Sequence, residues 1–245
     1  MEQGKKAIVT GATSGIGLAI CETLLSRGYT VYGFGRDFDK LEGRSLFAGK
    51  TDPPAAFYAV PGDLLDTEWL LREVKKIDRD KDVTLLVNCA GAAYYGLHEE
   101  QNPQKIQEMV RTNLELPMVL TQQLLRTLKK NGGRVINISS VTATRSSPHG
   151  AAYAATKAGL LSFSQSLFEE ARKTGLKVTA ILPDMTRTDL YRHADFTASD
   201  EPGCALSPED VARAVAYLLD QPDGVVVPEM ELRPQYHRIE RKKAK

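Results

Sequence analysis

KAIVTGATSGIGLAI (residues 6–20) joins a short apolar run to a glycine-rich turn and then to a helical pattern. The run has the length of a buried strand, and Ile16, Ile20 and Leu24 recur at the spacing of one helix face. A glycine lets the backbone approach a phosphate, and a helix start offers free N–H groups and a positive dipole end. The stretch therefore predicts a strand, a turn and a helix that cradle a diphosphate. The predicted contacts are Gly11, Thr13, Ser14, Gly15, Ile16 and Gly17.

Apolar runs and helical patterns alternate along the rest of the chain, with no internal repeat. Strands are expected at 29–35, 56–60, 83–87, 132–139 and 177–182, and the run 224–228 is expected to lie near a seventh strand. Helices are expected around 69–74, over 103–130 and 151–172, and after a cap at Ser207. This alternation predicts an α/β fold, a doubly wound (Rossmann) sheet of about seven mainly parallel strands with helices on both faces. Residues 1–237 are expected to form one domain, and 238–245 a basic, solvated tail.

The composition limits the classes of function that the protein can have. With 245 residues, 42% hydrophobic and 26% charged, the chain can bury a core, and its net charge of +1 gives no case for nucleic acid. Cys21, Cys89 and Cys204 are far apart and odd in number, and the histidines are scattered, so neither a disulfide framework nor a metal site is expected. We find no secretory segment and no apolar run near the length of a membrane span, which predicts a cytoplasmic protein.

Tyr153 and Lys157 are four residues apart in a stretch with helical composition, so their side chains would lie on one helix face. A cation near a phenol lowers its pKa by about three units at ~4 Å and an effective dielectric of ~20, which would bring Tyr153 close to neutrality as a general acid–base. Ser140 ends an apolar run and would hydrogen-bond a substrate oxygen beside Tyr153. Such a pair also arises by chance, so the other motifs must support it.

The end of the second strand is where dinucleotide folds read the adenosine ribose. Arg36 would pair with a 2′-phosphate, which favours NADP(H), whereas the adjacent Asp37 would bind ribose hydroxyls and favour NAD(H). The Asp63 carboxylate, after the third strand, would accept a hydrogen bond from an adenine amino group. Trp69 is expected in the core.

The long helical pattern over 103–130 contains Asn113 and, four residues later, Pro117. Both disfavour an uninterrupted helix, so a kink at Asn113 is expected. A carbonyl freed by the kink would hold a water near the active site.

In this order the glycine loop, Asn88-x-Ala90-Gly91, Asn113, Ser140 and Tyr153-x-x-x-Lys157 resemble the short-chain dehydrogenase/reductase family over about residues 5–230. The resemblance implies that Tyr153 is the general acid–base, Lys157 lowers its pKa and binds the nicotinamide ribose, and Ser140, in preference to Ser139, orients the substrate. It further implies that Asn113 supports a proton-relay water. The implied cofactor contacts are Asp63 and Leu64 at adenine, Asn88, Ala90 and Gly91 along the cofactor, and Pro183, Thr186 and Thr188 at the nicotinamide.

One departure lies beside the nicotinamide, where Asp184 follows Pro183 in place of the family's usual glycine. The resemblance implies an NAD(P)-dependent oxidoreductase, with NADPH favoured, that acts on a small carbonyl or alcohol as a homodimer or homotetramer. A non-catalytic dinucleotide sensor on the same fold is the alternative. The segment 186–196 should cover the substrate, but its mixed charges and aromatics name no substrate class.

Overall fold

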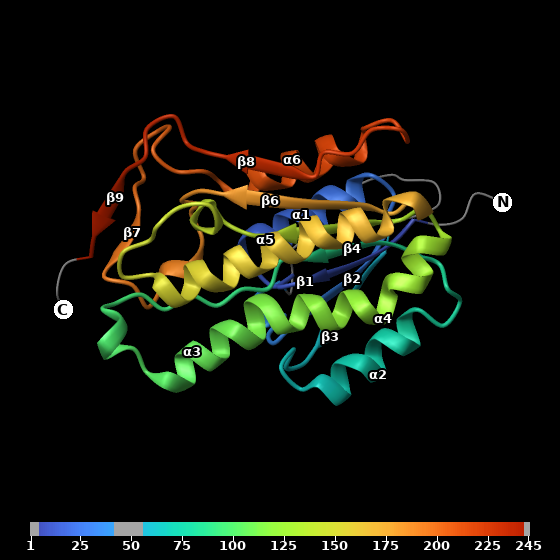
Figure 1. The fold of residues 1–245 in the computed structure, drawn as a ribbon, viewed down its shortest axis with the longest axis horizontal. Coiled ribbons are helices and arrows are strands. Elements are labelled where there is room, and N and C mark those ends of the chain that lie inside the picture. Colours follow the sequence, from blue (N-terminus) through green and yellow to red (C-terminus); the bar gives the residue numbers. More distant parts are fainter. Residues whose placement is uncertain (1–4, 42–55, 243–245) are drawn as a thin grey trace.

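A seven-stranded parallel sheet forms the centre of the molecule (Figure 1). The structure, a computed structural model, describes residues 5–41 and 56–242. The strand order is β3-β2-β1-β4-β5-β6-β8, and every pairing in it is parallel. This confirms the predicted doubly wound α/β fold. The strands are β1 (Lys6–Thr10), β2 (Thr30–Gly35), β3 (Phe57–Pro61), β4 (Val83–Asn88), β5 (Arg134–Ile138), β6 (Lys177–Pro183) and β8 (Glu229–Leu232).

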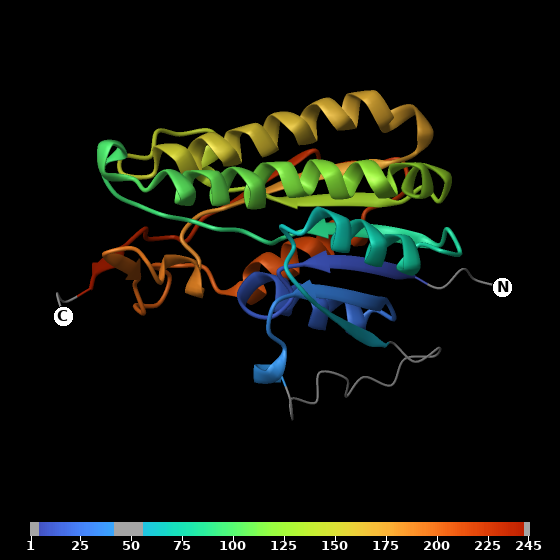
Figure 2. The ribbon, with the colours of Figure 1, turned by 90° about the horizontal axis from the view of Figure 1, so that it is seen from below.

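Helices cover both faces of the sheet (Figure 2). On one face, α1 (Gly15–Ser26) and α6 (Pro208–Leu219) pack with the strands around Ile20, Leu24 and Val215. On the other, α2 (Thr67–Ile77), α4 (Leu116–Lys130) and α5 (Ala151–Ala171) pack around Leu70, Leu124 and Leu167. Burial on both faces explains the nearly continuous apolar runs of the central strands. Within the described residues, no helix has the length and apolarity needed to cross a membrane.

The strand order reverses beside β1, which places the carboxyl ends of β1 and β4 next to each other. In open α/β sheets this switch point is where the ligand crevice forms. The Thr10 hydroxyl accepts hydrogen bonds from the backbone N–H groups of Cys89 (3.0 Å) and Ala90 (3.1 Å), so the loop after β4 is tied to the end of β1.

The long helix is interrupted where the sequence predicts a kink. α3 (Pro103–Val110) passes into a π-helical turn, Arg111–Glu115, before α4 begins. Asn113 lies in this π turn and is completely buried. Pro117 lies in the first turn of α4, directly after the π turn, and has no N–H to donate back to a carbonyl of that turn. The kink is confirmed, in the form of a π turn, a feature common at functional sites.

The C-terminal part differs from the prediction. The apolar run 224–228, expected near the seventh strand, leads directly into β8, and the carbonyls of Val227 and Pro228 accept hydrogen bonds from Thr179 and Ala180 of β6. The difference lies further along the chain. Ile239–Arg241, expected in a solvated tail, forms β9, which pairs antiparallel with β7 (Phe196–Ala198). Residues 243–245 of that tail lie outside the described residues. The three-residue strands have no periodicity long enough to predict them.

Candidate active site

The glycine loop between β1 and α1 requires glycine for steric reasons. Gly11 has φ +71°, and a Cβ there would lie 2.9 Å from the Ala90 Cα. A Cβ on Gly17 would lie 2.1 Å from the Gly11 carbonyl oxygen. Ser14 caps α1 without a side-chain hydrogen bond, and the first turn carries no acidic residue. The backbone N–H groups at the start of α1 therefore remain available, and this cradle fits the diphosphate of a dinucleotide.

A cleft opens beside this loop at the carboxyl ends of the strands. Most of the residues predicted for the site line it, which brings segments from β1 to β6 into one surface. These are Gly11, Thr13, Ser14, Gly15, Ile16, Gly17, Arg36, Asp63, Leu64, Ala90, Gly91, Ser140, Tyr153, Lys157, Pro183, Thr186 and Thr188. Their contacts with a cofactor stay predictions.

Asn88 and Asn113 do not line the cleft. The Asn88 side chain is buried inside the fold, where its Nδ2 donates hydrogen bonds to Asn137 Oδ1 (2.8 Å) and Thr121 Oγ1 (3.3 Å). The expectation that Asn88 lines the cofactor is therefore wrong for its side chain. As the last residue of β4 it points into the core, away from the cleft, and joins the sheet to α4.

Asn113 stabilises the cleft from behind. Its Oδ1 accepts from the Ala92 N–H (2.8 Å), and its Nδ2 donates to the Ala92 carbonyl (2.8 Å) and to Thr156 Oγ1 (3.0 Å). One buried side chain thus links the loop after β4 to α5. A Cβ on Gly91 would lie 3.7 Å from Asn113 Oδ1, so the amide lies just beneath the cleft wall. Its predicted role in holding a water stays a prediction.

Thr142, which no motif in the sequence marks, holds the Ser140 hydroxyl in place. Ser140 Oγ accepts hydrogen bonds from the Thr142 N–H (3.2 Å) and from Thr142 Oγ1 (3.0 Å). A serine hydroxyl has two lone pairs and one hydrogen. The two hydrogen bonds from Thr142 occupy both lone pairs, which leaves the hydrogen of the Ser140 hydroxyl free to donate. Ser139 instead donates to the Lys157 carbonyl (2.9 Å).

Tyr153 and Lys157 lie together on α5, as predicted, but the expected effect on the phenol is wrong. Lys157 Nζ lies 5.7 Å from the centroid of the Tyr153 ring and donates to the Ile138 carbonyl (2.9 Å). Burial raises the pKa of Tyr153 to about 12 although the hydrogen bond with Ser140 opposes it. Burial also lowers the pKa of Lys157 to about 8. Desolvation, which the spacing could not reveal, is the dominant cause of both shifts.

Arg36 and Asp37 are placed differently, although both are exposed. Arg36 lines the cleft, whereas Asp37 is absent from its lining, and Asp37 Oδ1 accepts the N–H of Asp39 (2.9 Å). Asp63, which lines the cleft, accepts the N–H of Leu65 (2.9 Å). Within the described part of the chain, no three metal-ligating side chains are grouped so that they could hold an ion.

The loop after β6 closes one side of the cleft. Asp184 lines it, and the Asp184 carboxylate accepts the Met185 N–H (2.7 Å) and lies 3.2 Å from His237 Nδ1. A Cβ on Gly15 would lie 3.1 Å from the Thr188 methyl group, so this loop meets the glycine loop.

Several lining residues carried no motif that sequence reasoning could use. One is Glu108 of α3, whose carboxylate accepts hydrogen bonds from Lys105 (2.9 Å) and Tyr94 (3.0 Å). Burial opposes these two hydrogen bonds, which nevertheless lower the pKa of Glu108. Other lining residues without a predicted role are Gly35, Leu65, Cys89, Ala92, Thr112 and Ile138.

Comparisons with known proteins agree with this arrangement. A family model described as short chain dehydrogenase matches residues 5–197. An uncharacterised oxidoreductase of Staphylococcus haemolyticus is 33% identical over 94% of this chain and 97% of its own length. A 3-oxoacyl-[acyl-carrier-protein] reductase of Haemophilus influenzae is 32% identical over 91% of this chain and 94% of its own. The alcohol dehydrogenase of Thermococcus sibiricus, solved with 5-hydroxy-NADP, superposes with a TM-score of 0.84 at 27% identity and covers 96% of this chain and 98% of that one.

Proposed function

The chain belongs to the short-chain dehydrogenase family, whose members are NAD(P)-dependent oxidoreductases, and from this premise we propose that it reduces a carbonyl group with NADPH. The relation to a reductase and to an NADP-bound alcohol dehydrogenase supports the proposal. The reverse reaction, oxidation of the alcohol, uses the same groups. The substrate is a small molecule, and a homodimer or homotetramer is the proposed assembly.

The observation that carries the proposal is the buried phenol of Tyr153 at the wall of the cleft, which Ser140 also lines. A bound nicotinamide would supply the hydride. Ser140 would hold the carbonyl oxygen, and Tyr153 would donate its proton to that oxygen as negative charge develops there. The raised pKa of Tyr153, about 12, keeps the phenol protonated at neutral pH. A phenol is a stronger acid than an alcohol, so this proton transfer is favourable and fits reduction.

Removing the phenol tests this role. Tyr153→Phe is expected to lower kcat by about 100-fold or more, in the range lost with a general acid. NADPH affinity, measured by fluorescence titration, should stay within about threefold, because the glycine loop is untouched. Tyr94→Phe, which removes a phenol that hydrogen-bonds Glu108, is the matched control. Turnover of Tyr153→Phe close to that of the wild type would refute the mechanism.

Arg36 supports NADPH over NADH, because it lines the cleft and Asp37 does not. A guanidinium paired with a phosphate forms a charge-assisted hydrogen bond worth about 1.5–3 kcal/mol, or roughly 10–100-fold in affinity. Arg36→Ser should therefore weaken NADPH binding by about that factor and leave NADH binding unchanged. Asp37→Asn is the neighbouring control and should change neither. Equal losses for both dinucleotides in Arg36→Ser would contradict the assignment.

A further inference from the structure

The C-terminal segment, residues 236–242, runs along the loop that follows β6. β9 pairs with β7 in antiparallel register, with Arg241 opposite Phe196 and Ile239 opposite Ala198. Both strands lie at the left end of the molecule in Figure 1, away from the N-terminus. The backbone N–H of Tyr236 and the carbonyl of Arg238 extend this pairing by bonding Gly203 and Ser199. The C-terminal segment therefore pairs along the loop after β6, which is expected to cover the substrate.

Lys242 forms the last anchor of the segment. Its backbone N–H donates to the Asp195 carbonyl (2.7 Å). Its Nζ donates to the carbonyls of Tyr191 (2.6 Å) and Arg192 (3.2 Å). These carbonyls lie at the end of the 3₁₀ turn Asp189–Tyr191, and the Tyr191 carbonyl also accepts the N–H of Ala194 (3.1 Å). One ammonium thus fixes the end of the turn that carries Tyr191.

Two acidic side chains strengthen the same contact. Glu240 of β9 accepts a hydrogen bond from the buried Ser199 hydroxyl (2.7 Å), and Arg238 pairs with Glu201 (2.6 Å). Upstream, His237 reaches Asp184 in the lining of the cleft. The segment therefore holds the loop at both of its ends.

The held loop carries an aromatic cluster that ends at Tyr153. The ring centroids of Phe196 and Tyr191 are 5.5 Å apart, and those of Phe196 and Tyr95 are 5.0 Å apart. Tyr95 in turn lies 5.8 Å from Tyr153. Tyr191 lines the cleft. Because Phe196 belongs to β7 and Lys242 binds the carbonyl of Tyr191 itself, movement of the C-terminal segment would move the rings beside Tyr153.

We propose that Lys242 is a positioning residue for the reaction, because it fixes Tyr191 and the aromatic cluster as the substrate wall of the cleft. The proposal rests on the proposed function for its effect on turnover, but not for its effect on the loop. Lys242 touches neither the glycine loop nor the groups that transfer the proton. Its loss is therefore expected to impair substrate binding more than the chemical step.

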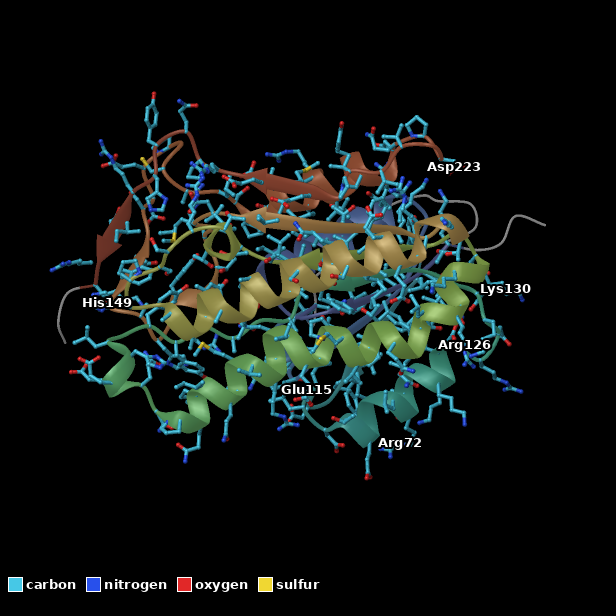
Figure 3. All side chains as sticks on the ribbon, viewed as in Figure 1. Arg72, Glu115, Arg126, Lys130, His149 and Asp223 are labelled. Atoms are coloured by element: carbon cyan, nitrogen blue, oxygen red, sulfur yellow. The ribbon has the colours of Figure 1, made fainter. Side chains whose placement is uncertain are left out.

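Hydrogen exchange, read by mass spectrometry on the full-length protein without added ligand, tests the effect on the loop. In Lys242→Met, amides of residues 187–196 should exchange about tenfold faster, the opening expected when a charged donor is lost from two carbonyls. Lys242→Arg keeps a cationic donor and should restore slow exchange. Lys130→Met removes an exposed cation at the opposite end of the molecule, labelled in Figure 3, and should leave this segment unchanged.

Steady-state kinetics with the fastest carbonyl in a panel of aliphatic and aromatic ketones tests the effect on the reaction. Lys242→Met should raise KM about threefold or more, through a poorer fit of the substrate wall, and keep kcat within about twofold. If no ketone is turned over, the proposed function fails, while the exchange experiment still decides the role of Lys242. Exchange in 187–196 that is unchanged, or that rises equally over the whole chain, would overturn the proposal.

Discussion

Lys157 carries the most unfavourably placed charge of the candidate site. Burial lowers the pKa of its ammonium to about 8, well below the 10.5 of a free lysine. Between these two pH values the unfolded chain binds more protons than the folded one, so stability rises with pH through this window. Below about pH 8 the cost of burying the charge is present in full. It disappears as the pH approaches 10.5.

This predicts a pH-dependent difference between the wild type and Lys157→Met. The shift of about 2.5 pKa units corresponds to about 3 kcal/mol. Relative to Lys157→Met, the wild type should gain roughly this free energy of unfolding from pH 8 to 10.5, measured by urea denaturation of the ligand-free protein. Lys173→Met, at an exposed lysine, controls for the loss of a charge. A difference that is flat over this range would mean that Lys157 titrates normally.

The same residues show what a sequence can reveal at this scale. The pairing of Tyr153 with Lys157 follows from helical spacing, and Ser140 lines the same cleft, while their joint action on one oxygen stays a prediction. The direction of the Tyr153 pKa shift did not follow. It depends on how much water the fold excludes, which is a property of packing between distant segments. The inward orientation of Asn88 has the same origin, because it depends on Thr121 and Asn137 from other elements.

Among the elements, the π turn between α3 and α4 leads to the most specific prediction, because Asn113 lies in it. Asn113 satisfies three buried partners at once, the N–H and C=O of Ala92 and the Thr156 hydroxyl. An unsatisfied buried polar group costs about 1–3 kcal/mol. Asn113→Ala should therefore lower the free energy of unfolding by about 3 kcal/mol or more, measured by urea denaturation. Ser166→Ala, on the exposed face of α5, should change it by less than about 0.5 kcal/mol.

Hydrogen exchange gives this prediction a local check. The Ala92 amide should lose its protection in Asn113→Ala well before the amides of β4 and β5, because its N–H loses the hydrogen bond to Asn113 while the strands keep their ladders. Ala92 protection equal to that of the wild type would show that the π turn does not hold the loop.

Element by element, the sequence predicted those parts of the fold that have local causes. The apolar runs became strands, the helix after Ser207 begins with the capping box formed by Ser207 and Asp210, and Asn113 marks the break in the long helix. β7 and β9 were missed, and the bounds of β8 were not given, because these strands depend on pairing across long stretches of chain. β9, for example, is three residues long and is defined by Phe196–Ala198, more than forty residues earlier.

At the scale of the whole molecule, the cleft joins segments that are distant in sequence. Gly11 and Gly17 come from the first twenty residues, Ala90 and Gly91 from the middle of the chain, and Thr188 from its last quarter. An unfolded chain does not hold these groups together, so a dinucleotide bound in the cleft stabilises only the folded state. Cofactor binding is therefore expected to raise the melting temperature of the entire domain.

The size of this rise can be predicted. NADPH at 100 times its Kd adds about 2.7 kcal/mol to stability. For a domain of this size, each kcal/mol shifts Tm by roughly 2–4 °C, which gives a rise of about 5–10 °C. Tyr153→Phe should show the same rise because the cradle is intact. Arg36→Ser should show a smaller rise at the same NADPH concentration and the full rise when NADPH is set to 100 times its own Kd. Differential scanning calorimetry measures this, and a Tm that does not respond to NADPH in the wild type would contradict the cleft as the dinucleotide site.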